Sequence, residues 1–215
     1  MNDTFRQLCL FVIAVASPLA GQKQDPGHSP IMIKEIDAKL EKLASGYDTV
    51  EGPLYDGRGH LLFTDIPNQQ IWKLNLKTLN TTLFLDDTGG ANGLAFDFHG
   101  RLLMCKQKEK SLARLEEDGT ETVLLKPTRM GANKKIYPVG VNDVVVDRKG
   151  RIYVTVPGAG SIYLLDSDGG NPRPVINGLK GPNGLMLSPD EKTLYVSEYK
   201  EQKLHTYEVD PTTGN

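Results

Sequence analysis

Four side chains that carry oxygen donors recur at similar spacings along the chain: Glu51, Asn92, Asn142 and Asn183. Counting by residue number, 41 residues separate the first from the second, 50 the second from the third, and 41 the third from the fourth. Carboxylate and amide oxygens are hard ligands, which suit calcium or magnesium better than zinc or copper. An ion held mainly by neutral amides keeps much of its charge and can polarise a carbonyl or phosphoryl oxygen. The set predicts a divalent-metal site, provided that the fold brings the four residues together.

The four residues also share a local pattern, in which a polar residue is followed by a small or acidic residue and then by an apolar segment. The four stretches, called openings below, are Val50-Glu51-Gly52-Pro53, Ala91-Asn92-Gly93-Leu94, Val141-Asn142-Asp143-Val144 and Pro182-Asn183-Gly184-Leu185. Repetition at about 40 to 50 residues is typical of stacked or circular architectures. A purely structural reading also stays open, because Asn-Gly and Asn-Asp are ordinary turn dipeptides.

Short segments with period two follow the openings and are separated by turn signals such as Asp-Gly and Lys-Gly. The expected strands are His60–Ile66, Ile71–Leu76, Thr82–Leu85, Leu102–Lys106, Ser111–Glu116, Glu121–Lys126, Ile152–Val156, Ser161–Asp166, Thr193–Glu198 and Lys203–Asp210. About four strands per repeat make one blade of a β-propeller. The first strand of each blade lies innermost, so the openings should converge at one end of the central channel. The stretch Thr128–Val139 is expected to be a loop at that channel mouth.

Composition places the chain among folded proteins, with 39% hydrophobic and 24% charged residues. The net charge of −2 argues against a general nucleic-acid or membrane-surface binder, since such binding needs clustered positive charge. The sequence contains no Gly-x-Ser-x-Gly elbow, His-Glu-x-x-His helix or phosphate-binding glycine loop. Cys105 lies inside an apolar strand, where a packed thiol is a better reading than a nucleophile.

The beginning of the chain is typical of an exported protein. An apolar run from Leu8 to Ala16, too short to span a bilayer, is followed by small residues and a proline. We expect a signal peptide at 1–20, a leader at 21–38 and a propeller domain at 39–215. The segment Lys34–Ala44 could be either a short amphipathic helix or a lone strand. After removal of the signal peptide, Cys105 would be the only cysteine, so no intramolecular disulfide is expected.

Several motifs together resemble the senescence marker protein, gluconolactonase and luciferin-regenerating-enzyme family. They are Glu51-Gly52-Pro53, Leu62-Phe63-Thr64-Asp65-Ile66-Pro67, Asn92-Gly93-Leu94, Gly100-Arg101-Leu102-Leu103, Asn142-Asp143-Val144, Gly150-Arg151-Ile152-Tyr153 and Pro182-Asn183-Gly184-Leu185. The resemblance implies an all-β fold, a six-bladed β-propeller with a divalent ion, commonly calcium, in its channel. It also implies hydrolysis of a small-molecule lactone or related ester.

Residue by residue, the resemblance implies that Glu51, Asn142 and Asn183 bind the metal. It implies substrate contacts for Asn92, Asn142 and Asp143. The family's remaining metal ligand, an aspartate that is also the favoured general base, opens the next blade, past Asn215, so no catalytic residue is assigned.

About four blades fit within the sequence. We therefore expect a C-terminally truncated fragment with little turnover of its own. A non-catalytic propeller that binds a ligand or protein at the channel mouth is the alternative.

Overall fold

The computed structural model describes residues 41–215, and Gly46–Asn215 form one compact unit. The signal peptide expected at 1–20 and the leader expected at 21–38 lie outside the described residues, so both stay predictions. Of the ambiguous segment Lys34–Ala44, the described residues 41–44 have no regular secondary structure. Within the described part of the chain, no helix is long and apolar enough to cross a bilayer.

The unit contains four antiparallel blade sheets, whose strands follow one another in chain order, and one separate two-stranded sheet. Blade one contains β1 (Val50–Tyr55), β2 (His60–Asp65), β3 (Gln70–Asn75) and β4 (Thr81–Leu85). Blade two contains β5 (Ala91–Phe96), β6 (Leu102–Lys106), β7 (Ser111–Leu115) and β8 (Glu121–Leu125). Blade three contains β11 (Val144–Val146), β12 (Ile152–Val156), β13 (Ser161–Leu165) and β14 (Arg173–Ile176). Blade four contains β15 (Pro182–Leu187), β16 (Thr193–Glu198) and β17 (Lys203–Glu208).

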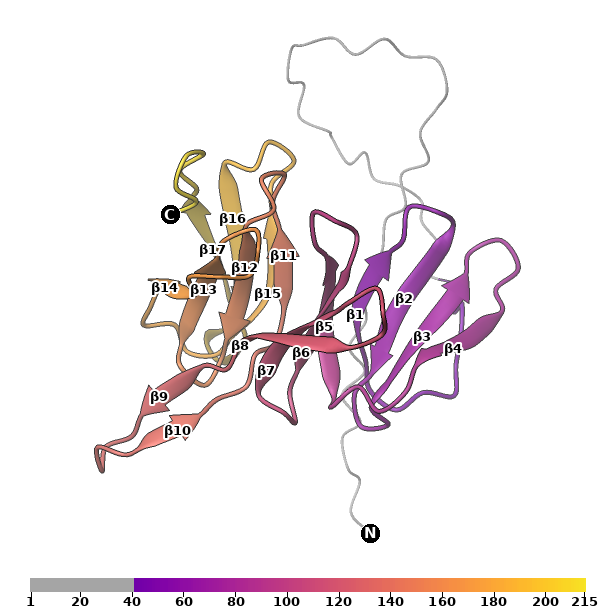
Figure 1. Ribbon diagram of the computed structural model, residues 1–215, viewed down its shortest axis with the longest axis horizontal. Coiled ribbons are helices and arrows are strands. Elements are labelled where there is room, and N and C mark those ends of the chain that lie inside the picture. The colour runs from indigo at the N-terminus through magenta and orange to yellow at the C-terminus, as the bar shows by residue number, and fades with distance from the viewer. Residues whose placement is uncertain (1–40) are drawn as a thin grey trace, which may run out of the picture. The chain divides into compact units, whose positions relative to one another are not determined.

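The first strands of successive blades contact one another, β1 with β5, β5 with β11 and β11 with β15 (Figure 1). This is the packing of propeller blades around a channel. The expected all-β fold with about four propeller blades is confirmed.

The turn between the first and second strands is built in the same way in three blades. In blade two, the Asp97 carboxylate accepts hydrogen bonds from the main-chain N–H groups of His99 and Arg101, both at 2.9 Å, and from Arg101 Nε at 2.8 Å. Gly100 takes the positive φ of 79° that the turn requires. Asp147 with Arg151 and Asp56 with His60 repeat the arrangement in blades three and one. These turns fix the register of the two innermost strands of each blade.

The hydrophobic core lies between the blades rather than at one centre. Three clusters of buried side chains fill the three interfaces. Leu62 and Met104 belong to the interface of blades one and two, and Leu103 and Val154 to that of blades two and three. Each opening is therefore held in place by the packing of its blade against the neighbouring blades.

Three elements differ from the sequence-based expectation. The expected loop at Thr128–Val139 contains a hairpin of β9 (Thr128–Met130) and β10 (Ile136–Pro138). The outer strand β14 was not among the expected strands. It contains Pro174, which an outer strand tolerates, since one side needs no N–H donor. A short 3-10 helix at Tyr199–Glu201 also joins β16 to β17.

Candidate functional site at the blade openings

Strand pairing confirms that the four openings occupy equivalent positions. Val50, Ala91 and Pro182 pair with Asp65, Lys106 and Glu198, which lie at corresponding places near the ends of the second strands. Immediately afterwards the register shifts by one residue, so that the first strand carries one extra residue in each blade. In blade three, the main chains of Asn142 and Asp143 both bond to Thr155, at 3.0 and 2.9 Å.

Such bulges turn side chains away from the regular pleat and are frequent next to active sites. Each opening therefore presents its polar residue from an irregular stretch of the innermost strand. Sequence patterns do not show these bulges, because a bulge is a property of two paired strands.

The backbones of neighbouring openings approach one another so closely that only glycine fits. A Cβ atom added to Gly52 would lie 2.0 Å from the carbonyl oxygen of Asn92. A Cβ atom on Gly93 would lie 2.3 Å from Asp143 Oδ1, and the Gly93 N–H donates to the Asn142 carbonyl at 2.9 Å. The glycines that follow Glu51 and Asn92 thus let the opening of blade one contact that of blade two, and the opening of blade two contact that of blade three.

The side chains of two openings are largely buried, but their amides make no hydrogen bond to another described residue. Asn92 is 4% exposed and Asn142 is 8% exposed. Their main-chain carbonyls accept hydrogen bonds, but within the described residues neither side-chain amide makes one. Buried amides normally have partners. Glu51 and Asn183 are half-buried at the equivalent positions of blades one and four. The openings of blades two and three therefore offer amide oxygens that accept no hydrogen bond from another described residue.

A small hydroxyl or thiol side chain lies behind each opening, at the same place on the second strand. The four residues are Thr64, Cys105, Thr155 and Ser197. Thr64 Oγ1 donates to the Asn92 carbonyl at 3.1 Å, and Ser197 Oγ donates to the Gly184 carbonyl at 3.2 Å. The Asp143 N–H donates to Thr155 Oγ1 at 2.9 Å. These contacts hold the bulged main chain, and aligning the four repeats by their openings would have revealed them.

Asp143 stands where the other openings have glycine, and its carboxylate joins blade three to blade four. Oδ1 accepts a hydrogen bond from the Val144 N–H at 2.9 Å, and Oδ2 accepts one from the Leu185 N–H at 3.1 Å. Burial raises the pKa of this carboxyl to about 6, although both hydrogen bonds act to lower it. Burial, together with the charge of Asp143, also raises the pKa of the Cys105 thiol. Cys105 is fully buried, as expected for a packed thiol.

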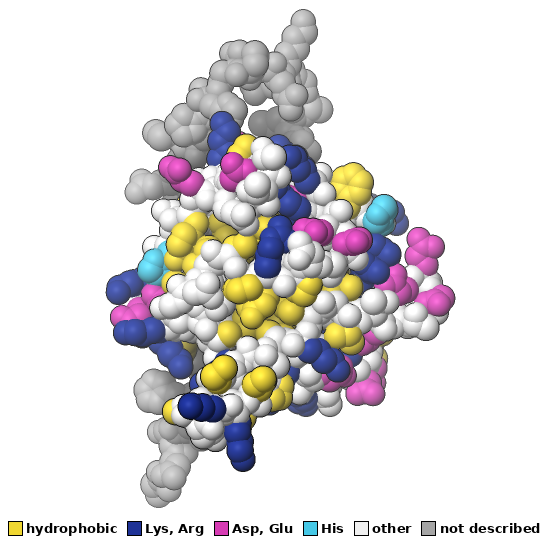
Figure 2. All heavy atoms as spheres, turned by 60° about the vertical axis from the view of Figure 1, so that its left-hand side comes forward, with side chains coloured by type: hydrophobic (Ala, Val, Ile, Leu, Met, Phe, Trp, Pro, Cys, Tyr) yellow, Lys and Arg dark blue, Asp and Glu magenta, His cyan; other side chains and the backbone are white. Residues whose placement is uncertain are grey.

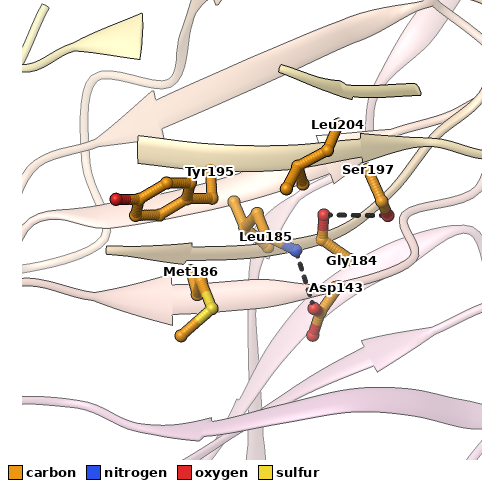
Figure 3. A pocket seen from close by; sticks show the side chains of 7 residues that line it. All are labelled: Asp143, Gly184, Leu185, Met186, Tyr195, Ser197 and Leu204. Carbon is orange, nitrogen blue, oxygen red and sulfur yellow. Dashed lines mark hydrogen bonds between the residues drawn. The ribbon is translucent and has the colours of Figure 1, made fainter. Parts of the chain in front are cut away.

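Asp143 also borders a pocket on the face of blade four (Figure 3). The pocket has a volume of about 380 Å³ and is lined by Asp143, Gly184, Leu185, Met186, Tyr195, Ser197 and Leu204. Its lining is mostly apolar, and Met186 and Leu204 are exposed. Figure 2 brings the side of blades three and four forward and shows hydrophobic side chains gathered in the middle of this face.

The donors at the openings suit a hard divalent ion. Within residues 41–215, no three His, Cys, Asp or Glu side chains gather closely enough to hold an ion by themselves. An ion at the openings would therefore depend on the Glu51 carboxylate and on neutral amide oxygens, a donor set that fits calcium or magnesium. The Asn142 side-chain amide, which makes no hydrogen bond to another described residue, agrees with such a metal site.

Fold and site together define a propeller whose innermost strands present oxygen donors at one end of the channel. The family model described as the SMP-30/gluconolactonase/LRE-like region matches residues 49–215. The chain belongs to this family, which confirms the resemblance drawn from the motifs.

Curated relatives share about a quarter of their residues with the chain. Lactonase drp35 of Staphylococcus saprophyticus is 27% identical over 175 residues, which cover 74% of this chain and 51% of the relative. A gluconolactonase of Zymomonas mobilis is 23% identical over 192 residues, covering 77% of this chain and 53% of the relative. The chain spans about half the length of these relatives.

Solved structures agree with the fold. A gluconolactonase from Xanthomonas campestris has a TM-score of 0.67 and 26% identity, over 78% of this chain and 61% of that one. A calcium-binding regucalcin from Agrobacterium tumefaciens has a TM-score of 0.60 and 20% identity, over 80% of this chain and 58% of that one. The second likeness shows the fold alone.

Proposed function

We propose that the whole protein hydrolyses lactones or related esters with the help of a divalent metal ion, most simply calcium. The observation that carries the proposal is the stacking of four equivalent openings on neighbouring innermost strands, two of which hold the largely buried side chains of Asn92 and Asn142, whose amides make no hydrogen bond to any described residue. Membership of the family and the lactonase and gluconolactonase names of the relatives support the same reaction class. The relatives are about twice as long as the matched region, so the activity is proposed for the whole protein.

Each opening has its own role in this proposal. Among the proposed ligands within residues 41–215, Glu51 supplies the single negative charge, and Asn142 and Asn183 supply neutral amide oxygens. A hard divalent ion bound there would polarise the lactone carbonyl towards attack by water. Asn92 lies one blade away from both Glu51 and Asn142, where its amide N–H2 group can donate to a substrate oxygen.

Asp143 orients the site. Its two carboxylate oxygens accept hydrogen bonds from the N–H groups of Val144 and Leu185. The contact of Asp143 with substrate stays a prediction, and its carboxylate borders the blade-four pocket. Its main role is to hold the Asn142 and Asn183 openings at a fixed separation.

Metal binding by the 215-residue chain gives a test that does not depend on turnover. Calcium at about one hundred times its dissociation constant should stabilise the folded state by about 2.7 kcal/mol, a rise in the melting temperature of about 5 to 10 °C. Glu51→Gln should abolish this rise, because the ligand set loses its only carboxylate. Glu117→Gln, in an exposed turn, is the matched control and should respond as the wild type does. A calcium response retained in full by Glu51→Gln would refute the ligand assignment.

Hydrolysis is tested with the whole protein, including any sequence that precedes or follows the 215 residues. Lactone opening releases an acid, so the rate can be followed by titration at constant pH. The rate should vanish with chelator and return with calcium. A rate that survives removal of the metal would refute the metal-dependent mechanism even if calcium binding had been found.

A non-catalytic ligand-binding propeller is the second candidate, favoured by the largely apolar pocket beside Asp143. Such a protein would bind a lactone and calcium without consuming the lactone. Calorimetric titration with a lactone followed by chromatography of the recovered ligand separates the two functions. Recovery of intact lactone after prolonged incubation of the whole protein with calcium would support the binding module.

A further inference from the structure

The β9–β10 hairpin projects from the connection between blades two and three. Every residue from 128 to 138 except Gly131 is exposed, whereas Pro127 and Val139 on either side are buried. The Val139 N–H donates to the Pro127 carbonyl at 3.0 Å and closes the base of the hairpin. The chain continues from Val139 directly into the Asn142 opening. The hairpin therefore stands at the same end of the propeller as the openings.

One face of the hairpin is apolar, although no other part of residues 41–215 covers it. Met130 pairs directly with Ile136 across the two strands, so the two side chains share a face. Met130 is 72% exposed and Ile136 is 69% exposed, and Tyr137 on the other face is 40% exposed. Exposed apolar side chains that cluster in this way mark an interaction site more often than scattered ones do.

The hairpin and its base carry only positive charge. Between Glu121 and Asp143 the chain has four basic residues and no acidic residue. The basic residues are Lys126, Arg129, Lys134 and Lys135. None of them forms an ion pair with another residue in the described part of the chain. Figure 2 shows hydrophobic and basic side chains together at the lower tip of the molecule, the level at which the hairpin lies in Figure 1.

We propose that this hairpin docks the protein onto an anionic lipid surface. Lys134 and Lys135 would lie among the headgroups, and Met130 and Ile136 would enter the boundary between headgroups and acyl chains. Basic residues gain free energy near an anionic leaflet, and apolar side chains gain it by leaving water. An acidic protein or a nucleic acid would satisfy the lysines but would leave the Met130–Ile136 pair without a role.

The overall charge of the protein does not oppose this binding. The net charge of −2 excludes a generally basic surface, but attraction to a lipid surface falls off within a Debye length of about 8 Å. Only charges near the contact matter, and those on the hairpin are all positive. The inference does not depend on the proposed hydrolase function.

Vesicle sedimentation tests the proposal on the 215-residue chain. The chain should bind vesicles of phosphatidylcholine and phosphatidylglycerol at 7:3 and should bind pure phosphatidylcholine much more weakly. Lys134→Gln with Lys135→Gln should weaken binding about thirtyfold, since each lysine near the surface contributes about a factor of five. Arg58→Gln with Lys77→Gln, which removes the same charge from exposed turns of blade one, should change binding less than twofold.

The apolar contribution has its own pair of variants. Met130→Ser with Ile136→Ser should weaken vesicle binding about tenfold or more, because both side chains would leave water on docking. Leu79→Ser with Phe98→Ser alters two exposed apolar residues in the connections of blades one and two and should leave binding unchanged. Far-ultraviolet circular dichroism of each variant checks that the sheets are intact.

Fluorescence quenching by brominated lipid locates the contact directly. Ile136→Trp places an indole on the apolar face of the hairpin, and Phe98→Trp places one in an exposed turn of blade two as the control. Trp72, the single native tryptophan, gives the background signal. We expect strong quenching for Ile136→Trp and background quenching for Phe98→Trp.

Three results would overturn the proposal. The first is equal vesicle binding by the wild type and by both hairpin double variants. The second is quenching of Ile136→Trp at the background level while the protein is bound to vesicles. The third is binding to polyglutamate that depends on Lys134 and Lys135 but not on Met130 and Ile136, with no binding to vesicles; this pattern would assign the hairpin to an acidic protein partner.

Discussion

Replacing Gly93 by alanine tests the close stacking of the openings. The added Cβ would lie 2.3 Å from Asp143 Oδ1, 2.6 Å from Asp143 Cα and 2.8 Å from the Asn142 carbonyl oxygen. Two of these three atoms belong to the main chain, so a side-chain rotation cannot relieve the contact. Gly93 does not have a positive φ, and the cost of Gly93→Ala is therefore purely steric.

The size of the effect follows from overpacking. An extra methyl group in a close-packed region costs about 1 to 3 kcal/mol, and the stiff main-chain neighbours place Gly93→Ala at the upper end. Gly140→Ala is the matched control, because its Cβ would meet only the Gln107 carbonyl oxygen, at 3.7 Å. That substitution should be neutral or stabilise the protein by about 0.4 to 1 kcal/mol through the unfolded chain.

Urea unfolding followed by circular dichroism measures both variants. With a slope of about 2 kcal/mol per molar urea, Gly93→Ala should lower the midpoint by about 1 M or more, and Gly140→Ala should leave it unchanged or raise it slightly. Equal midpoints for Gly93→Ala and wild type would refute the stacking of blade two on blade three described above.

Three further predictions concern the residues around the openings. Burial raises the pKa of Asp143 from 3.8 to about 6, so the folded state favours the protonated carboxyl. In calcium-free buffer, the free energy of unfolding of the wild type relative to Asp143→Asn should be highest below pH 3.8 and should fall by up to about 3 kcal/mol as the pH rises to 6. A difference that stays constant across this range would contradict the burial of the charge. Thr155→Val should weaken calcium binding while Thr155→Ser retains it, since only serine keeps an oxygen that accepts from the Asp143 N–H. Equal calcium affinities of the two variants, measured by calorimetry, would show that Thr155 does not position the Asn142 opening. Cys105 should react with a thiol reagent only as fast as the protein unfolds, because it is fully buried and its pKa is raised; rapid labelling of folded protein, followed by mass spectrometry, would disprove this.

The strands and the openings could be predicted because their signals are local. Period-two runs and glycine turns lie within a few residues of one another, so Leu102–Lys106, Ile152–Val156 and Thr193–Glu198 were predicted with their observed bounds. The equivalence of Glu51 with the three asparagines could likewise be read from spacing, and strand register confirms it.

Other features depend on residues far apart in sequence and could not be predicted. The Asp143 carboxylate accepts a hydrogen bond from the Leu185 N–H, which lies 42 residues away along the chain. The bulges at the openings need the register of the partner strand. The β9–β10 hairpin carries no alternating pattern, since its tip is Gly-Ala-Asn-Lys-Lys, and the pairing of Met130 with Ile136 emerges only in the folded protein.

The base of the β9–β10 hairpin has a consequence for protein engineering. The chain leaves the propeller at Pro127 and returns at Val139, and these two residues are joined by one main-chain hydrogen bond of 3.0 Å. The segment between Pro127 and Val139 begins and ends at this hydrogen bond, so a change in its length should alter neither the end of β8 nor the start of the Asn142 opening. The entropy of closing a loop grows only with the logarithm of its length, at about 0.6 kcal/mol for each doubling. The connection between blades two and three is therefore a natural place to insert an epitope or a small reporter domain.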